Sequence, residues 1–195
     1  MPVNLKKGGN VSLAKAAPGM THAVVGLGWD VRTTDGAQFD LDASAILCDA
    51  NGKAPDETHF VFYNNKQDPS GAVAHAGDNR TGEGGGDDET ITVDLSRIPA
   101  SIEKVAVLAS IDQAAERGQN FGQVSNAYIR VFDADHPDNS ETQVRFDLGE
   151  DAATETALVF GEIYRNNGEW KFRAVGQGYE TGLEGVISDF GLSAG

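Results

Sequence analysis

The sequence is poor in cysteine: Cys48 is alone among 195 residues, so no internal disulfide can form. The lack of disulfides is typical of proteins from a reducing compartment. Cys48 ends the apolar run at residues 45–48, where we expect a buried structural thiol. No stretch reaches the length of a membrane span, and no apolar core of a signal peptide follows Lys6 and Lys7. We therefore expect a cytoplasmic protein without a membrane span.

Positive charge is also scarce, because 15 Lys and Arg residues face 30 Asp and Glu residues, for a net charge of −15. A surface this negative repels phosphate backbones, so nucleic acid is not an expected partner. It attracts cations or a basic protein surface instead. The four histidines are scattered along the chain, and the lone cysteine lies in a core run, so the sequence does not predict a zinc site.

Long helical patterns are few. Short stretches instead alternate between apolar and polar residues, as strands with one buried face do. Turn-forming groups at residues 35–36, 51–52, 68–71 and 166–168 separate these stretches. The pattern predicts an all-β protein, a β-sandwich of two mostly antiparallel sheets. The chain shows no linker and no internal repeat, so we expect one domain over residues 1–195.

The C-terminal tail has the clearest helical spacing, at Leu183, Val186, Ile187 and Phe190, with Gly191 as the expected stop. We expect one short C-terminal helix packed on a sheet.

Residues 154–164 fit either a helix or a strand. The turn sequence at residues 166–168 leads into the alternating run 170–175, which favours a hairpin and therefore a strand at residues 154–164.

The strongest functional signal is an acidic, glycine-rich segment at residues 77–89. Its carboxylates supply the oxygen ligands that Ca²⁺ prefers, and its glycines allow backbone carbonyls to bend toward an ion. We expect a divalent metal site here, with Ca²⁺ as the favoured ion. The candidate ligands in this segment are Asp78, Asn79, Thr81, Glu83, Asp87, Asp88 and Glu89.

Other interpretations of the acidic segment are an EF-hand, a magnesium site, a phosphate loop and a solvated loop. An EF-hand does not fit, because it needs ligands at every second position and a closing glutamate. Mg²⁺ could use two or three of the carboxylates. A phosphate loop is disfavoured, because the Gly-Lys-Ser/Thr ending is missing and carboxylates repel phosphate. A solvated acidic loop without a ligand explains the same composition.

A second acidic cluster occupies residues 27–48, where Asp35-Gly36 predicts a hairpin turn. Burial of the apolar residues in both strands requires a loop with an odd residue count, since a slip of one residue exchanges the two faces. We then expect Asp30, Arg32, Asp40 and Asp42 together on the outer face, where the aspartates complete the first metal site or form a second one. A solvated face partly neutralised by Arg32 is the alternative.

These residues carry a family resemblance over nearly the whole chain. The matching segments are Gly26-Leu27-Gly28-Trp29-Asp30, Phe39-Asp40-Leu41-Asp42-Ala43-Ser44, Phe60-Val61-Phe62-Tyr63-Asn64, residues 77–82 and 87–89, Arg117-Gly118-Gln119-Asn120-Phe121, Asn126-Ala127-Tyr128-Ile129-Arg130 and residues 174–179. In this pattern the chain resembles the TerD family of tellurium-resistance and stress-response proteins.

The resemblance implies a β-sandwich that binds Ca²⁺, usually as two ions, in the bacterial cytoplasm. It implies a role in tellurite resistance together with other Ter-family or membrane-associated stress proteins. The acidic positions that match the family pattern are Asp30, Asp40, Asp42, Asp78, Asn79, Asp87, Asp88 and Glu89. Glu83 matches less closely, and Gly85 departs from the pattern because an acidic residue is common near it in the family.

An enzyme is not expected. Ser44 and Ser110 lack a recognisable nucleophile motif, and the resemblance implies no catalytic activity. A metal-dependent phosphoesterase or hydrolase that uses the same carboxylates is the first alternative. An acidic protein-interaction module without metal is the second.

Overall fold

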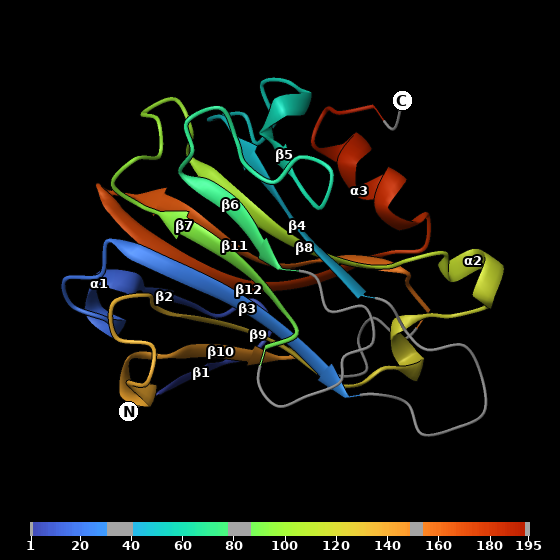
Figure 1. Ribbon diagram of the computed structural model, residues 1–195, viewed down its shortest axis with the longest axis horizontal. Coiled ribbons are helices and arrows are strands. Elements are labelled where there is room, and N and C mark those ends of the chain that lie inside the picture. Colours follow the sequence, from blue (N-terminus) through green and yellow to red (C-terminus); the bar gives the residue numbers. More distant parts are fainter. Residues whose placement is uncertain (1, 31–40, 78–86, 149–153, 194–195) are drawn as a thin grey trace.

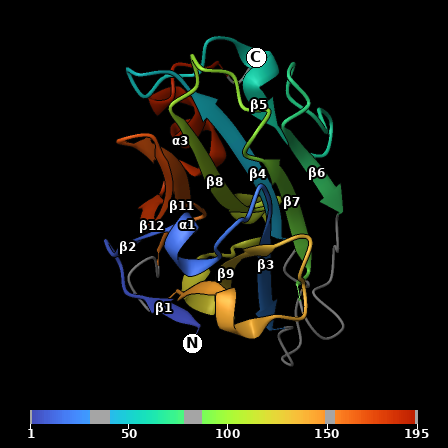
Figure 2. The same ribbon diagram turned by 90° about the vertical axis from the view of Figure 1, so that its left-hand side faces the viewer.

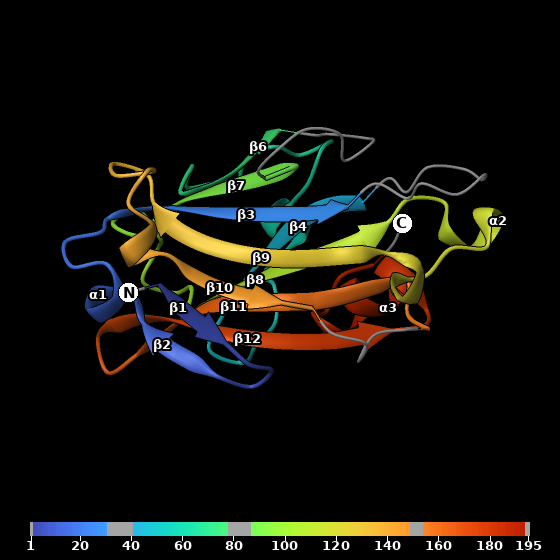
Figure 3. The same cartoon turned by 90° about the horizontal axis from the view of Figure 1, so that it is seen from below.

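The computed structural model describes residues 2–30, 41–77, 87–148 and 154–193. Two six-stranded sheets pack face to face, which confirms the predicted all-β sandwich (Figure 1). The view from below shows the two layers (Figure 3). Within the described ranges, no helix is long and apolar enough to cross a membrane.

Among the described strands, all pairs are antiparallel except that of β1 (Val3–Leu5) with β10 (Val144–Asp147), which is parallel in register Val3↔Val144. The first sheet contains, in spatial order, β1 (Val3–Leu5), β10 (Val144–Asp147), β9 (Ser125–Asp133), β3 (His22–Asp30), β7 (Glu89–Asp94) and β6 (Val73–Gly77). The second sheet contains β2 (Asn10–Ser12), β12 (Glu169–Tyr179), β11 (Ala157–Asn166), β8 (Lys104–Ile111), β4 (Leu41–Cys48) and β5 (Phe60–Val61). The edge strands on each side of the sandwich are therefore consecutive in the chain. They are β1 and β2 on one side, and β5 and β6 on the other.

The helices are short. The longest, α3 (Gly182–Asp189), packs on the outer face of the second sheet, away from the first sheet (Figure 2). This helix confirms the prediction for the C-terminal tail, and Gly191 follows it with a φ of 82°. The other helices are α1 (Leu13–Ala16) and α2 (Ala114–Arg117), and the 3-10 segments are η1 (Glu57–His59), η2 (Phe121–Gln123) and η3 (Ser140–Thr142).

The main core lies between the sheets, and a second apolar cluster lies between the second sheet and α3. Strand β4 faces both: Leu41 and Ala43 enter the main core, whereas Ile46 and Cys48 face the helix. A strand buried on both faces reads as a continuous apolar run. This explains why Cys48 is fully buried, as its sequence context predicts.

The hairpin predicted at residues 166–168 is confirmed. Strands β11 and β12 pair in register Asn166↔Glu169. Asn167 and Gly168 have φ values of 52° and 78°, the two successive positive φ values of a two-residue turn that suits the strand twist.

The hairpin predicted within residues 27–48 is wrong. Strand β3 pairs with β7 and β9 in the first sheet, whereas β4 pairs with β5 and β8 in the second. The turn residues Asp35 and Gly36, together with Arg32, lie outside the described residues. The local prediction of which residues are inward was nevertheless right, since Leu27 and Trp29 are buried in the main core.

Candidate functional site

The acidic residues that the structure brings together lie where β3 ends and β7 begins. The backbone amide of Asp88 donates to the carbonyl of Leu27 at 2.8 Å, and the strands continue in register Leu27↔Glu89. This pairing holds residues 87–89 beside the last residues of β3, at one end of the sandwich (Figure 1).

The carboxylate of Asp87 lies on the outer face of the first sheet, bound by two side chains of β9. The Arg130 guanidinium donates to Oδ2 from Nη2 at 2.7 Å and to Oδ1 from Nε at 2.8 Å. The Tyr128 hydroxyl donates to Oδ1 at 3.0 Å. A bidentate contact between arginine and a carboxylate is geometrically specific and stronger than a single bond between neutral groups, so Asp87 fixes this end of the acidic segment to the sheet.

Two glycines of β3 make room for these side chains. A Cβ atom at Gly26 would lie 2.2 Å from Oδ2 of Asp87, and one at Gly28 would lie 2.4 Å from the Tyr128 ring. Gly26 pairs across the ladder with Arg130, and Gly28 with Tyr128. Because glycine alternates with Leu27 and Trp29, β3 has bulky side chains on its inner face and none of its own at Gly26 and Gly28 on its outer face, where the side chains of Asp87 and Tyr128 lie.

The environment of the Asp87 carboxylate keeps the side chains of Arg130 and Tyr128 protonated. Hydrogen bonding to Asp87 raises the pKa of Arg130 further above its usual value. Burial, followed by the charge of Asp87, raises the pKa of the Tyr128 hydroxyl well above its usual range. Both groups remain donors to Asp87 at every physiological pH.

The Asp88 carboxylate points toward β3. Its Oδ2 accepts a hydrogen bond from the backbone amide of Trp29 at 3.0 Å, and the residue is 8% exposed. The next residue, Asp30, is exposed and contacts the side-chain amide of Asn126. Asn126 holds a left-handed backbone with a φ of 52°. Asp88 is therefore positioned by Trp29 of β3, and Asp30, the next residue of that strand, by Asn126 of β9.

Glu89 points into the sandwich and connects the sheets. Its side chain is completely buried, and Oε2 accepts a hydrogen bond from the backbone amide of Ala43 in β4 at 2.6 Å. Oε2 also lies 3.3 Å from Nε2 of the buried His75 in β6. Within the described residues, strand β5 pairs with Ala45 and Ile46 of β4. The Ala43 amide lies beyond the end of that pairing, and Glu89 supplies its acceptor.

The predicted metal ligands thus fall into three groups. Asp30, Asp87, Asp88 and Glu89 gather at one end of the sandwich. Asp42 does not join them, because it lies on the face of the second sheet that carries α3. The prediction that Asp42 and Asp30 lie together on one outer face is therefore wrong. The other candidates, Asp40, Asp78, Asn79, Thr81 and Glu83, lie outside the described residues.

The fit of a calcium ion can be judged from the donors present. Asp30 is exposed, Asp88 is buried and bound to the amide of Trp29, the residue before Asp30, and both aspartates carry the hard oxygen atoms that Ca²⁺ prefers. The residues for which the structure gives positions hold no group of three His, Cys, Asp or Glu side chains close enough for a metal ion. A complete site would therefore need oxygens from residues 31–40 or 78–86, where five candidates lie.

Sequence reasoning missed the partners of the acids: Arg130, Tyr128 and His75. One signal was available, because an arginine and a tyrosine at alternate positions of a predicted strand share a face. Nothing in the sequence indicated which carboxylate they would bind, since Asp87 lies 43 residues before Arg130.

Comparison with known proteins covers the entire length of the chain. A family model described as "TerD domain" matches residues 1–190. Tellurium resistance protein TerD of Serratia marcescens is 55% identical over 195 residues, covering 100% of both chains. General stress protein 16U of Bacillus subtilis is 48% identical over 196 residues, again covering 100% of both chains.

A solved structure has the same fold. The crystal structure of a homologue of telluride resistance protein (TerD) from Streptomyces coelicolor A3(2) superposes with a TM-score of 0.67 at 25% sequence identity, and the match covers 90% of this chain and 99% of that one. The fold, the family model and the full-length relatives agree, and the chain belongs to the TerD domain family of tellurium-resistance and stress-response proteins.

Proposed function

We propose that this chain is a calcium-binding, non-enzymatic module of tellurite resistance and the general stress response. It would act in the cytoplasm together with other proteins of its family or with membrane-associated stress proteins. Full-length relatives named for tellurium resistance and for general stress support the biological role. The net charge of −15 supports a cation as ligand.

The observation that carries the calcium proposal is the hydrogen bond that holds the Asp88 carboxylate at Trp29, the residue before Asp30. Acidic residues gathered at one end of a sheet repel each other, and a bound cation would offset this repulsion. Asp30 and Asp88 would carry the ion, and oxygens from residues 31–40 and 78–86 would complete its coordination.

Asp87 and Glu89 support the same proposal in a different role. Their carboxylates are engaged by Arg130 on the outer face and by Ala43 in the interior. These contacts fix the residues on both sides of Asp88 and pre-organise its carboxylate for a ligand. A bound calcium ion would add a charge that draws the acidic segment together.

The decisive experiment is a calorimetric Ca²⁺ titration with Mg²⁺ as competitor. Asp30→Asn and Asp88→Asn each remove one negative charge while keeping the size of the side chain and an oxygen acceptor. We expect each to weaken Ca²⁺ binding at least about tenfold, equal to a loss of about 1.4 kcal/mol. Asp138→Asn is the matched control, because Asp138 is exposed and lies beyond the opposite end of β9.

Unchanged Ca²⁺ affinity in both site variants, or equal weakening in the control, would contradict the proposed site. The non-enzymatic role is tested separately with p-nitrophenyl phosphate. Turnover that depends on added metal and is lost in Asp88→Asn would show a hydrolase instead.

One observation favours a second candidate, an acidic protein-interaction module without metal. Asp87, Asp88 and Glu89 each accept a hydrogen bond from a protein group, so structural roles could account for all three. Thermal unfolding separates the two candidates, because a ligand that binds only the folded state raises stability by about 2.7 kcal/mol at a hundredfold excess over Kd. An equal melting temperature in Ca²⁺ and in chelator would favour the metal-free module.

A further inference from the structure

A cavity of about 440 Å³ opens on the outer face of the second sheet, bordered by α2, by the start of α3 and by the connection after β5. Its volume is in the range of small-molecule sites. Asp42 and its cross-strand partner Ser110 contribute to its wall. None of the residues that carry the proposed calcium site, Asp30 and Asp88, contributes to it.

The charge of this cavity has one sign. Among the described residues that line it, none is Lys, Arg or His, and five are acidic. They come from three parts of the chain: β4, the region of α2, and the entry to α3. The acidic lining residues are Asp42, Asp112, Glu116, Glu180 and Glu184.

An aromatic ring and apolar side chains complete the lining. Tyr63 is 49% exposed and is the one large apolar side chain that is exposed in the described ranges. Ile111 and Leu183 contribute to the same cavity. An aromatic face beside carboxylates attracts organic cations, because the ring quadrupole and the charges act in the same direction.

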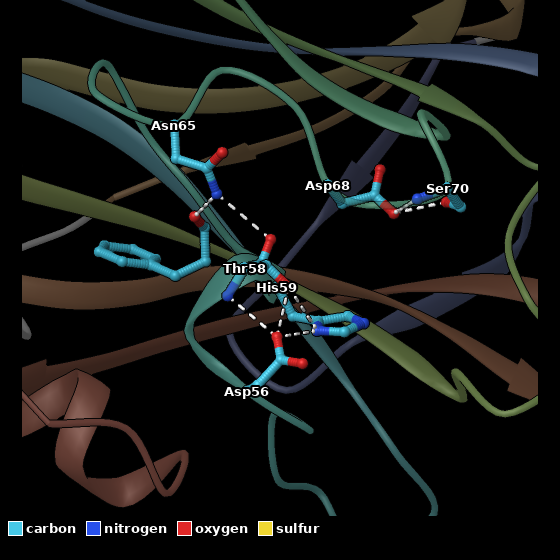
Figure 4. Close-up of polar contacts among 7 residues, drawn as sticks. Asp56, Thr58, His59, Asn65, Asp68 and Ser70 are labelled. Atoms are coloured by element: carbon cyan, nitrogen blue, oxygen red, sulfur yellow. Dashed lines mark hydrogen bonds and ion pairs between the residues drawn. The ribbon is translucent and has the colours of Figure 1, made fainter.

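The segment that carries Tyr63 is held in place by local hydrogen bonds. The Asn65 amide donates to the carbonyls of Phe60 at 2.8 Å and Thr58 at 3.2 Å (Figure 4). Phe62 and Asn65 exchange two backbone hydrogen bonds. Tyr63 lies between these two residues, so its ring is presented from a closed turn.

A buried hydroxyl lies on the strand that carries Asp42, next to the residues that line the cavity. Ser44 is 2% exposed, and its hydroxyl has no hydrogen-bond partner among the residues that the structure describes. It lies two residues from Asp42 along β4, so both side chains are on the same face of the sheet. A buried hydroxyl without a partner is costly. Ser44 does not itself line the cavity, so a polar ligand group would have to reach past Asp42 to satisfy it.

We propose that this cavity binds an aliphatic organic cation, an alkylammonium or alkylguanidinium group. A metal ion fits less well, because no three of the described acidic side chains are close enough to share one ion. The acids instead line a cavity whose wall also includes Tyr63, Ile111 and Leu183. A charged head with a hydrocarbon stem matches both features.

Two sources supply this chemistry: a free polyamine, or a lysine or arginine side chain of a partner protein. Calorimetric titrations with spermidine and with Nα-acetyl-arginine amide distinguish them, with Nα-acetyl-norleucine amide as the uncharged control. All titrations are carried out in saturating Ca²⁺, so that the proposed metal site does not compete with the cavity for the organic cation. We expect saturable binding of at least one cation and none of the uncharged compound.

The variant Glu180→Gln/Glu184→Gln should weaken binding at least about tenfold, because it removes two charges from the rim. Tyr63→Ser should weaken binding by about two- to fivefold, the contribution of an exposed cation–π contact. The matched control is Asp138→Asn/Glu141→Gln, which removes two exposed charges from the opposite end of the sandwich.

Circular dichroism and thermal unfolding confirm that each variant is folded. Absence of saturable binding by both cations would overturn the proposal. Equal weakening in the control double variant would also overturn it, because the cations would then respond to net charge alone. Calcium binding is measured on the same samples, so that a failure of the calcium proposal is seen independently.

Discussion

The Asp87 carboxylate occupies the position that a side chain at Gly26 would need, with 2.2 Å between Oδ2 and an added Cβ atom. Gly26→Ala should therefore destabilise the fold by about 1–3 kcal/mol through overpacking. In an Asp87→Ala background the obstacle is gone, and the same change should be neutral or stabilising because glycine is unfavourable within a strand. Urea unfolding of the four proteins measures this coupling. An identical cost in both backgrounds would contradict the close contact.

Glu89 links the two sheets through the amide of Ala43. Glu89→Ala should cost about 3 kcal/mol or more, since it removes a buried acceptor and leaves a cavity. Glu89→Gln keeps an oxygen for Ala43 and should cost less. Urea unfolding followed by tryptophan fluorescence gives both values. A cost below about 1 kcal/mol for the alanine variant would exclude a structural role of this size.

The Cys48 thiol should not react in the native protein. Burial raises its pKa from 9.0 to about 12, and only the thiolate is a good nucleophile. Alkylation by iodoacetamide at pH 8 should be slow in the folded protein and prompt in urea. Rapid labelling of the native chain would contradict the burial. Direct thiol chemistry with tellurium compounds is accordingly not expected from the folded state.

The same pKa shift predicts a dependence of stability on pH. A thiol whose pKa is higher in the folded state contributes its full stabilisation below the unfolded pKa. That contribution is lost as pH rises from about 9 toward 12. Cys48→Ala removes this loss, so its unfolding free energy should fall less steeply than that of the wild type between these pH values. Parallel profiles would contradict the assignment.

Asn126 positions Asp30 through its side-chain amide. Its φ of 52° suits glycine, so Asn126→Gly should leave the unfolding free energy within about 1 kcal/mol of the wild type. If Asp30 carries calcium, the variant should bind Ca²⁺ more weakly. Asn167→Gly is the matched control, with the same φ in the hairpin between β11 and β12. Equal calcium affinities in both variants would assign Asn126 a purely structural role.

Much of the fold could be predicted from the sequence because burial leaves a local pattern. Alternation identified Leu27 and Trp29 as inward residues, and successive turn residues identified the hairpin at Asn167 and Gly168. The pairing of strands left no such pattern. The turn residues at positions 35–36 favoured a hairpin, but β3 and β4 belong to different sheets.

The candidate site was predictable only in part for the same reason. Carboxylate composition indicated which acids to consider, and Asp30 and Asp87–Glu89 do gather at one end. Their partners come from distant strands: Arg130 from β9 and Ala43 from β4. The same distance concealed the role of Gly26, whose missing side chain matters only because Asp87 lies over it. Asp42 was misplaced because its position depended on the hairpin.

The first twelve residues have a consequence for association between molecules. Strands β1 and β2 each contain three residues and cover β10 and β12. A chain that lacks residues 2–12 would expose two longer strands with unpaired backbone groups, which are templates for polymerisation. We expect it to form large assemblies in sedimentation experiments, whereas the intact chain stays small. The N-terminal segment would then act as a built-in terminator of sheet growth.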